Sequence, residues 1–202
     1  MKDAALLVIA QLFGFATTIT VIWLREYYIK RKLNSEKLSP ICKAELFMQL
    51  TNICGEIKKD LNANGVYISY FHNGDYYKNG MSIDKFTVVA EDYDENISKG
   101  YIGKYSNMNI SYISYLYHRL LTDGRCYKIN VPNLQMVDNV YRQDLLDRNV
   151  VSSYSFLIKD DKELPIGFIS IEYTYEFYFK REMESFIWKH QLSTSRKIKN
   201  IK

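Results

Sequence analysis

The sequence predicts an α+β domain that follows a single N-terminal transmembrane helix. An uncharged apolar run at residues 4–24 predicts the membrane helix. Helical and strand patterns alternate over residues 39–190, and turn-forming residues join two of the strand pairs. We expect a mainly antiparallel sheet, with the first and last helices on one face and the middle segments on the other. The chain therefore divides into an anchor at 1–24, a basic linker at 25–38, the domain at 39–190 and a basic tail at 191–202.

Residues 4–24 contain no Asp, Glu, Lys or Arg. A helix of this length spans about 30 Å, the thickness of the hydrocarbon core of a bilayer. The alternatives are a buried core helix and a cleaved signal peptide. Core helices are seldom this long and uncharged, and the run ends in Val21-Ile22-Trp23-Leu24 instead of an Ala-x-Ala-like cleavage site. The first interpretation is therefore a single pass through a lipid bilayer.

The charges on the two sides of this run predict its orientation. Only Lys2, balanced by Asp3, precedes it, whereas residues 25–37 contain five basic and two acidic residues. Because basic flanks stay in the cytoplasm, we expect the N-terminus outside and the domain on the cytoplasmic side of a bacterial inner membrane. The membrane-flanking residues are Trp23, Arg25, Lys30, Arg31 and Lys32.

Charge is unevenly distributed, which bears on the class of partner. The net charge is +4, of which residues 25–37 carry +3, residues 189–202 carry +5 and the central residues 38–188 carry −4. A mildly acidic domain is unlike a nucleic-acid-binding surface, so we expect no nucleic-acid partner. The three cysteines form no CxxC pair, and we expect no metal site from them.

The first part of the domain predicts a helix followed by a hairpin. Ser39-Pro40 is a helix start signal, and apolar residues recur at steps of three and four over residues 46–61. Asn64-Gly65 ends the helix, and we predict strands at 66–72 and 82–91 across a polar loop that contains glycine.

The second part predicts a helical insertion, a hairpin and a last helix. Asn149 stands at a tight helix-to-strand turn, where we expect the left-handed conformation. We expect no regular structure beyond residue 191, where the apolar period stops. The predicted elements are a loop at 92–110, a helix at 110–121, a strand at 126–131, a helix at 137–147, strands at 150–158 and 165–173, and a helix at 177–191.

Three segments of this domain carry a family pattern: Phe71-His72-Asn73-Gly74, residues 144–158 and residues 165–172. Together they resemble a GAF domain over residues 41–188, and more closely the GAF-like proteins encoded by bacterial viruses. The chain departs from the pattern at Asn149, where the family usually has glycine. It also lacks the cysteine of bilin-binding members and the NKFDE-type signature of cyclic-nucleotide-binding members. The resemblance therefore implies the fold and transfers neither ligand.

The GAF-like arrangement implies a pocket between the sheet and residues 92–132. For each residue that can contribute to it, ordinary packing in the core is the alternative to ligand contact. The candidate pocket residues are Tyr70, His72, Asn73, Phe86 and Tyr154, and because strand residues alternate between the two faces we expect only some of them to face the pocket.

Catalytic candidates are few. His72, beside Asn73 and Asp75, can serve as a general base, and the alternative is a side chain that hydrogen-bonds the hairpin loop. Asp92, Asp94 and Glu95 can hold a cation through oxygen ligands, but we favour the alternative, a solvated loop. The chain contains no P-loop, HExxH, GxSxG or CxxC motif. We therefore expect no enzyme activity, no metal and no cofactor.

The function that follows is a membrane-anchored, non-enzymatic docking module for a viral or host protein. A plugged or vestigial pocket would favour this hypothesis. Two alternatives remain: a small-molecule sensor that signals through its membrane helix as a homodimer, and an enzyme with an unrecognised site at His72.

Overall fold

The computed structural model describes residues 20–26, 40–76, 82–128, 130–133 and 139–199. The chain forms two compact units, residues 1–42 and residues 43–202. In the first unit, residues 20–26 are helical and include Trp23 and Arg25, whereas most of the predicted span and Lys30, Arg31 and Lys32 lie outside the described residues. Within the described ranges, no helix has both the length and the apolar character required to cross a bilayer.

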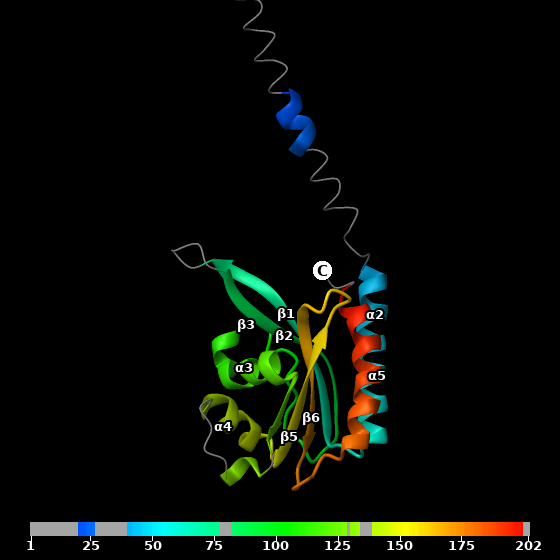
Figure 1. Cartoon of the computed structure of the whole chain (residues 1–202), viewed down its shortest axis with the longest axis vertical. Helices are drawn as coiled ribbons and strands as arrows, with labels where there is room; N and C mark the ends of the chain where they lie inside the picture. The colour runs from blue at the N-terminus through cyan, green and yellow to red at the C-terminus, as the bar shows by residue number, and fades with distance from the viewer. Residues whose placement is uncertain (1–19, 27–39, 77–81, 129, 134–138, 200–202) are drawn as a thin grey trace, which may run out of the picture. The chain divides into compact units, whose positions relative to one another are not determined.

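The second unit contains a six-stranded antiparallel sheet (Figure 1). Both predicted hairpins are present, because β1 pairs with β2 and β5 pairs with β6. Strands β1 and β6 join the two hairpins at the centre of the sheet, and the strand order is β3-β2-β1-β6-β5-β4. The strands are β1 (Gly65–Tyr76), β2 (Ser82–Tyr93), β3 (Met108–Asn109), β4 (Arg125–Lys128), β5 (Ser152–Lys159) and β6 (Pro165–Tyr173).

Helices cover both faces of the sheet, as the sequence predicts (Figure 1). The two long helices α2 (Pro40–Asp60) and α5 (Arg181–Ile198) lie side by side on one face. The other face carries α3 (Ser114–Asp123), α4 (Asn139–Asp147) and the short turns η1 (Ile110–Ile113) and η2 (Val131–Asn133). The described part of the domain is therefore an α+β sandwich of three layers.

Each face of the sheet has its own hydrophobic core. On the α2 and α5 side, the predicted helical stripe packs on alternate strand residues, as Ile57 of α2 and Ile187 of α5 meet Ile169 and Ile171 of β6. On the other side, Leu116 and Leu120 of α3 and Leu145 of α4 pack in a core with aromatic and aliphatic residues of the sheet and loops, such as Phe86 and Phe168. The second core contains the site described below.

Several elements differ from the sequence prediction: α5 begins at Arg181 instead of residue 177, and the helix predicted at 110–121 is η1 followed by α3. Helix α5 continues to Ile198 instead of ending near residue 191, because Thr194, Ser195 and Ile198 are buried against the domain. Strand β3 has only two residues, too few for a periodic pattern, and lies in the predicted loop. Strand β4 ends at Lys128, and Val131 belongs to η2.

Asn149 adopts the predicted left-handed conformation, with a φ of 64°. Its amide N–H bonds the Leu146 carbonyl, which closes the turn after α4. Asparagine tolerates positive φ better than most residues, so it can replace the glycine that is usual in GAF domains. This turn directs the preceding residue, Arg148, into the domain.

Candidate functional site

A buried ion pair lies on the α3 and α4 side of the sheet, where the sequence predicts a pocket. Arg148 and Glu172 are 1% and 0% exposed, and Arg148 Nη1 donates to Glu172 Oε2 over 2.6 Å. Glu172 occupies a position of β6 that faces this side, while its neighbours Ile171 and Tyr173 face α2 and α5. A buried charge needs a partner, and this pair supplies one for each residue.

Two tyrosines complete the surroundings of the ion pair. The guanidinium carbon of Arg148 lies 3.4 Å from the ring centre of Tyr101 and 4.6 Å from that of Tyr67. Tyr101 Oη donates to Glu172 Oε1 over 3.0 Å, and Arg148 Nη2 donates to Tyr67 Oη. Arg148 Nε donates to the Lys99 carbonyl over 2.7 Å. Each of the three guanidinium nitrogens therefore has an acceptor.

The protonation states follow from these contacts. Burial lowers the pKa of Arg148, but the Glu172 carboxylate and the two phenols outweigh this effect and hold the pKa above its ordinary value. Burial also raises the pKa values of Tyr67 and Tyr101 well above the ordinary range. Burial raises the pKa of Glu172 too, although the Arg148 guanidinium and the hydrogen bond from Tyr101 oppose this effect. At neutral pH the cluster therefore contains a charged arginine, paired with Glu172, among neutral phenols.

A second polar cluster lies beside the first, around Asp144 of α4. Its carboxylate accepts hydrogen bonds from the hydroxyls of Tyr105 and Tyr112 and, over 2.6 Å, from Lys104 Nζ. Burial raises the pKa of Asp144, but these three hydrogen bonds outweigh it and lower the pKa below its ordinary value. Burial and the hydrogen bond to Asp144 raise the pKa of Tyr112 to about 12. Asp144 is therefore ionised and fixes three side chains of residues 104–112 on α4.

Aromatic packing connects the two clusters. The ring centres of Tyr101 and Tyr105 are 4.5 Å apart, and those of Tyr105 and Phe86 are 6.0 Å apart. Tyr141 lies in the same core, with Lys128 Nζ 4.2 Å from its ring centre. The chain's own side chains thus occupy the space between the sheet and α4, whereas a hollow remains between the end of β1 and α3, lined in part by Ile110 and Tyr117.

The structure separates the five predicted pocket residues into three locations. Tyr70, His72 and Asn73 line a hollow of about 270 Å³ at the far end of β1, with Asp84 and Tyr117 among its other walls. Phe86 is buried in the core beneath α3 and α4, and Tyr154 is buried on the opposite face with α2 and α5. One common pocket does not contain all five.

His72 makes contacts that hold the hairpin. Its Nε2 lies 2.9 Å from Thr87 Oγ1, its Nδ1 lies 3.4 Å from the Asn73 carbonyl, and its ring stacks on Tyr70. Thr87 Oγ1 in turn accepts the backbone N–H of Asn107 over 2.8 Å. These contacts correspond to the structural alternative for His72.

The predicted acidic cluster makes separate local contacts. Asp92 pairs with Lys58, and Asp94 accepts hydrogen bonds from the Asn64 side chain and the Asn96 backbone N–H. Among the described residues, no group of three or more His, Cys, Asp or Glu side chains is placed to bind a metal ion.

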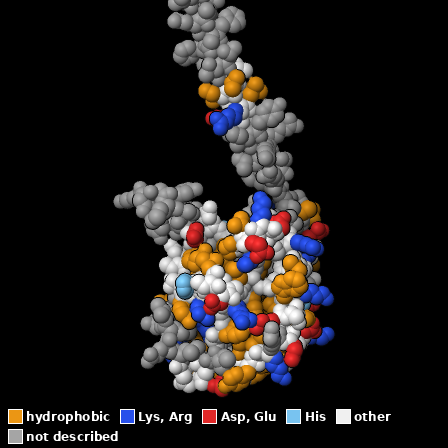
Figure 2. All heavy atoms as spheres, viewed as in Figure 1, with side chains coloured by type: hydrophobic (Ala, Val, Ile, Leu, Met, Phe, Trp, Pro, Cys, Tyr) orange, Lys and Arg blue, Asp and Glu red, His pale blue; other side chains and the backbone are white. Residues whose placement is uncertain are grey.

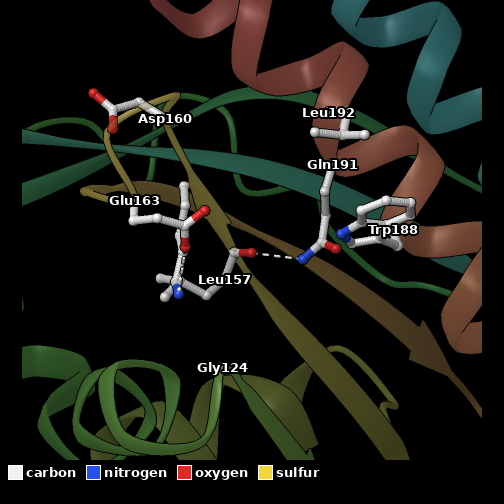
Figure 3. A pocket seen from close by; sticks show the side chains of 8 residues that line it. Gly124, Leu157, Asp160, Glu163, Trp188, Gln191 and Leu192 are labelled. Carbon is white, nitrogen blue, oxygen red and sulfur yellow. Dashed lines mark hydrogen bonds and ion pairs between the residues drawn. The ribbon is translucent and has the colours of Figure 1, made fainter.

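The most exposed candidate surface lies between α5, the end of β5 and the turn before β4. Two adjoining hollows of about 280 and 350 Å³ share Gly124, Trp188 and Gln191, and we call them together the α5 groove. Trp188 is 64% exposed, and Leu192 beside it is also exposed. Figure 3 shows both side chains on α5, facing the strand and turn that form the opposite wall.

Polar groups define the walls of the α5 groove. Gln191 Nε2 donates to the Leu157 carbonyl over 2.5 Å, so α5 covers the edge of β5 beyond Arg125, the first residue of β4 (Figure 3). Charged side chains mix with hydrophobic ones over the viewed face of the domain (Figure 2). The groove itself has more acidic than basic side chains: Asp123, Asp160, Glu163 and Glu184 against Arg125 and Lys159.

The sequence prediction missed Arg148, Glu172, Tyr101 and Trp188. One signal was present, because Glu172 interrupts an apolar strand at an inward position, where a charge requires a buried partner. The partner itself is 24 residues away, and no local pattern identifies it. The signal for Trp188 is weaker. It is a large apolar residue that lies beside the buried stripe of α5, which includes Ile187, and not within it.

Comparisons with known proteins support the fold. Neither a family model nor a curated protein matches the chain at the level of sequence. Solved structures do match, among them a GAF domain region from Geobacter sulfurreducens, with 11% identity, a TM-score of 0.56 and coverage of 78% of this chain and 95% of that one.

Two further matches are proteins with functions of their own. The blue-light absorbing form of the PixJ GAF domain from Thermosynechococcus elongatus matches with 9% identity and a TM-score of 0.56, covering 82% of this chain and 91% of that one. A type II free methionine-R-sulfoxide reductase from Thermoplasma acidophilum matches with 13% identity and a TM-score of 0.51, covering 78% and 94%. At these identities the likeness establishes a GAF-like fold and carries over no activity.

Proposed function

We propose that this chain is a membrane-tethered, non-enzymatic docking module, which holds a viral or host protein at the cytoplasmic face of a bacterial inner membrane. The observation that supports docking over sensing is the filled interior. Arg148, Glu172 and the tyrosines around them pack in the space between the sheet and α3 and α4. A sensor would have to expel a satisfied buried ion pair before a small molecule could enter.

The proposed tether rests on the sequence. The uncharged run at residues 4–24 has the length of a membrane span, and the basic residues after it favour a cytoplasmic domain. The tail adds Arg196, Lys197, Lys199 and Lys202. Basic residues near an anionic membrane surface each contribute about 1 kcal/mol of attraction, so the tail is suited to the same location.

We propose the α5 groove as the docking surface. Trp188 and Leu192 offer apolar area at the surface, and aromatic residues of this kind dominate binding energy at interfaces. Within the groove Arg125 pairs with Glu184 and Lys159 pairs with Glu163, which leaves Asp160, and Asp123 beside Arg119, as the additional acidic groups. We therefore propose that the groove accepts a protein segment with an apolar side chain next to a Lys or Arg.

Photo-crosslinking from position 188 tests this surface. A photoreactive amino acid replaces Trp188 in the full chain, expressed in its host, and the matched control replaces Tyr178, which is 67% exposed and does not line the groove. We expect one protein to crosslink at 188 and not at 178, through a segment with apolar and basic residues. Trp188→Ala should weaken binding of that protein about 30-fold, the effect of losing a typical interface hot spot.

The same experiment can contradict the proposal. Equal crosslinking from positions 188 and 178, or unchanged affinity in Trp188→Ala, would exclude the α5 groove as the docking surface. Recovery of the full chain in the soluble fraction after high-speed centrifugation of a detergent-free lysate, with its mass intact, would exclude the tether.

A further inference from the structure

Arg148 occupies its surroundings as a ligand occupies a binding site. Its side chain leaves the turn after α4 and ends between residues that are distant in sequence: Lys99, Tyr101, Tyr67 and Glu172. The residue is among the largest fully buried side chains of the domain. All the hydrogen bonds that the structure describes for the Arg148 side chain are made by its guanidinium group. This group therefore holds the side chain in place.

The walls match the two kinds of surface that a guanidinium presents. Three acceptors meet its edge: the Glu172 carboxylate at 2.6 Å, the Lys99 carbonyl at 2.7 Å and the Tyr67 hydroxyl. The ring of Tyr101 covers its face at 3.4 Å. The guanidinium group of arginine is planar, carries its donors in a fixed fork and stacks flat on aromatic rings. The ammonium group of lysine is not planar and has no such fork.

The walls are also held independently of Arg148. Tyr101 Oη donates to the other oxygen of Glu172 over 3.0 Å, and the rings of Tyr67 and Tyr101 contact each other with centres 4.6 Å apart. Tyr67 and Glu172 belong to β1 and β6, which pair at the centre of the sheet. The carboxylate and the two rings should therefore keep their arrangement when the arginine side chain is removed.

We propose that the interior of this domain is a guanidinium-binding cage, formed by Tyr67, Tyr101, Glu172 and the Lys99 carbonyl, which the chain fills with its own Arg148. The ligand class of the cage is a small planar cation that donates hydrogen bonds from its edge, such as guanidinium or methylguanidinium. A neutral planar molecule lacks the charge that Glu172 requires, and a rounded ammonium lacks the flat face that stacks on Tyr101. The proposal rests on the filled interior that also supports the docking function.

Chemical rescue tests the cage. The full chain with Arg148→Ala is purified in a mild detergent, and its thermal unfolding is followed with up to about 50 mM guanidinium chloride, far below the molar concentrations that denature proteins. We expect guanidinium to raise the Tm of this variant by about 3 to 6 °C when it reaches ten times its Kd. Urea and sodium chloride at the same concentrations should have no such effect.

Two variants serve as controls. Arg148→Ala/Glu172→Gln removes the carboxylate and should abolish the rescue, while Arg119→Ala removes an exposed arginine that pairs with Asp123 and should show none. If Arg148→Ala is unfolded in buffer, the same titration is followed by far-UV circular dichroism, and the folded fraction should rise with guanidinium and not with urea.

Failure of the cage has a clear signature. An equal response to guanidinium and urea, or a rescue that survives Glu172→Gln, would overturn it. The crosslinking of Trp188 does not depend on this result, because that experiment uses the chain with Arg148 in place. Loss of the rescue with retained crosslinking would therefore reject the cage alone.

Discussion

Replacing Arg148 with methionine is expected to lower the free energy of unfolding by about 3 to 5 kcal/mol, because the Glu172 carboxylate would remain buried without its cation. Methionine fills much of the same volume, so the loss reports the missing charge and hydrogen bonds more than a cavity. For a domain of this size the Tm should fall by about 6 to 20 °C. Urea unfolding followed by tryptophan fluorescence and circular dichroism measures the effect.

Two variants separate the charge from the packing. Arg148→Met/Glu172→Leu removes both partners, and it should recover most of the lost stability, since no buried charge is then unpaired. Arg119→Met removes an arginine from an exposed ion pair and should change the free energy of unfolding by less than about 0.5 kcal/mol. If Arg148→Met were as stable as the wild type, the Arg148–Glu172 pair would not stabilise the interior.

Replacing Asp144 with alanine is expected to cost about 2 to 4 kcal/mol. The variant leaves the hydroxyls of Tyr105 and Tyr112 and the ammonium of Lys104 without their common acceptor. Residues 104–112 should then detach from α4, which hydrogen exchange can locate along the chain. The matched control is Asp147→Ala on the same helix, where only an exposed hydrogen bond from Gln143 is lost.

The pH dependence of the free energy of unfolding separates the effect of the Asp144 charge from the effect of its shape. Its pKa in the folded state is lowered, so its contribution is fully present above the unfolded pKa of about 3.9 and is lost as pH falls through the folded value. Asp144→Asn keeps the shape without the charge. The stability difference between wild type and this variant should be constant near pH 6 to 7 and shrink below about pH 4. A difference that stays constant to pH 2 would contradict the ionised state.

Local patterns were sufficient for most of the fold. The spacing of Leu46, Leu50, Ile53 and Ile57 predicted α2, and turn residues between β-branched segments predicted the hairpins that the structure contains. The end of α5 was not predictable in this way, because Ser195 and Ile198 are fixed by packing on distant strands. Tertiary contacts decide such boundaries, and periodicity does not record them.

The contacts in the interior could not be predicted from a local sequence pattern, for the same reason. The prediction named Tyr70, His72, Asn73, Phe86 and Tyr154 as candidates and expected only some of them to face the pocket. Strand alternation alone does not show which face each residue takes, and β1 and β2 shift register between Ile68 and Ser69. The contacts of Arg148 join residues 49, 81 and 24 positions apart. Only the folded chain brings these residues together.

Native mass spectrometry of the full chain can show whether the chain's own side chains fill the interior of the GAF-like domain. The protein is incubated with a small-molecule extract of host cells and is then released from detergent micelles in the spectrometer. We expect the mass of the polypeptide, alone or with a protein partner, and no small molecule bound in stoichiometric amount. A retained molecule of a few hundred daltons that survives Trp188→Ala would contradict the account and establish an open pocket.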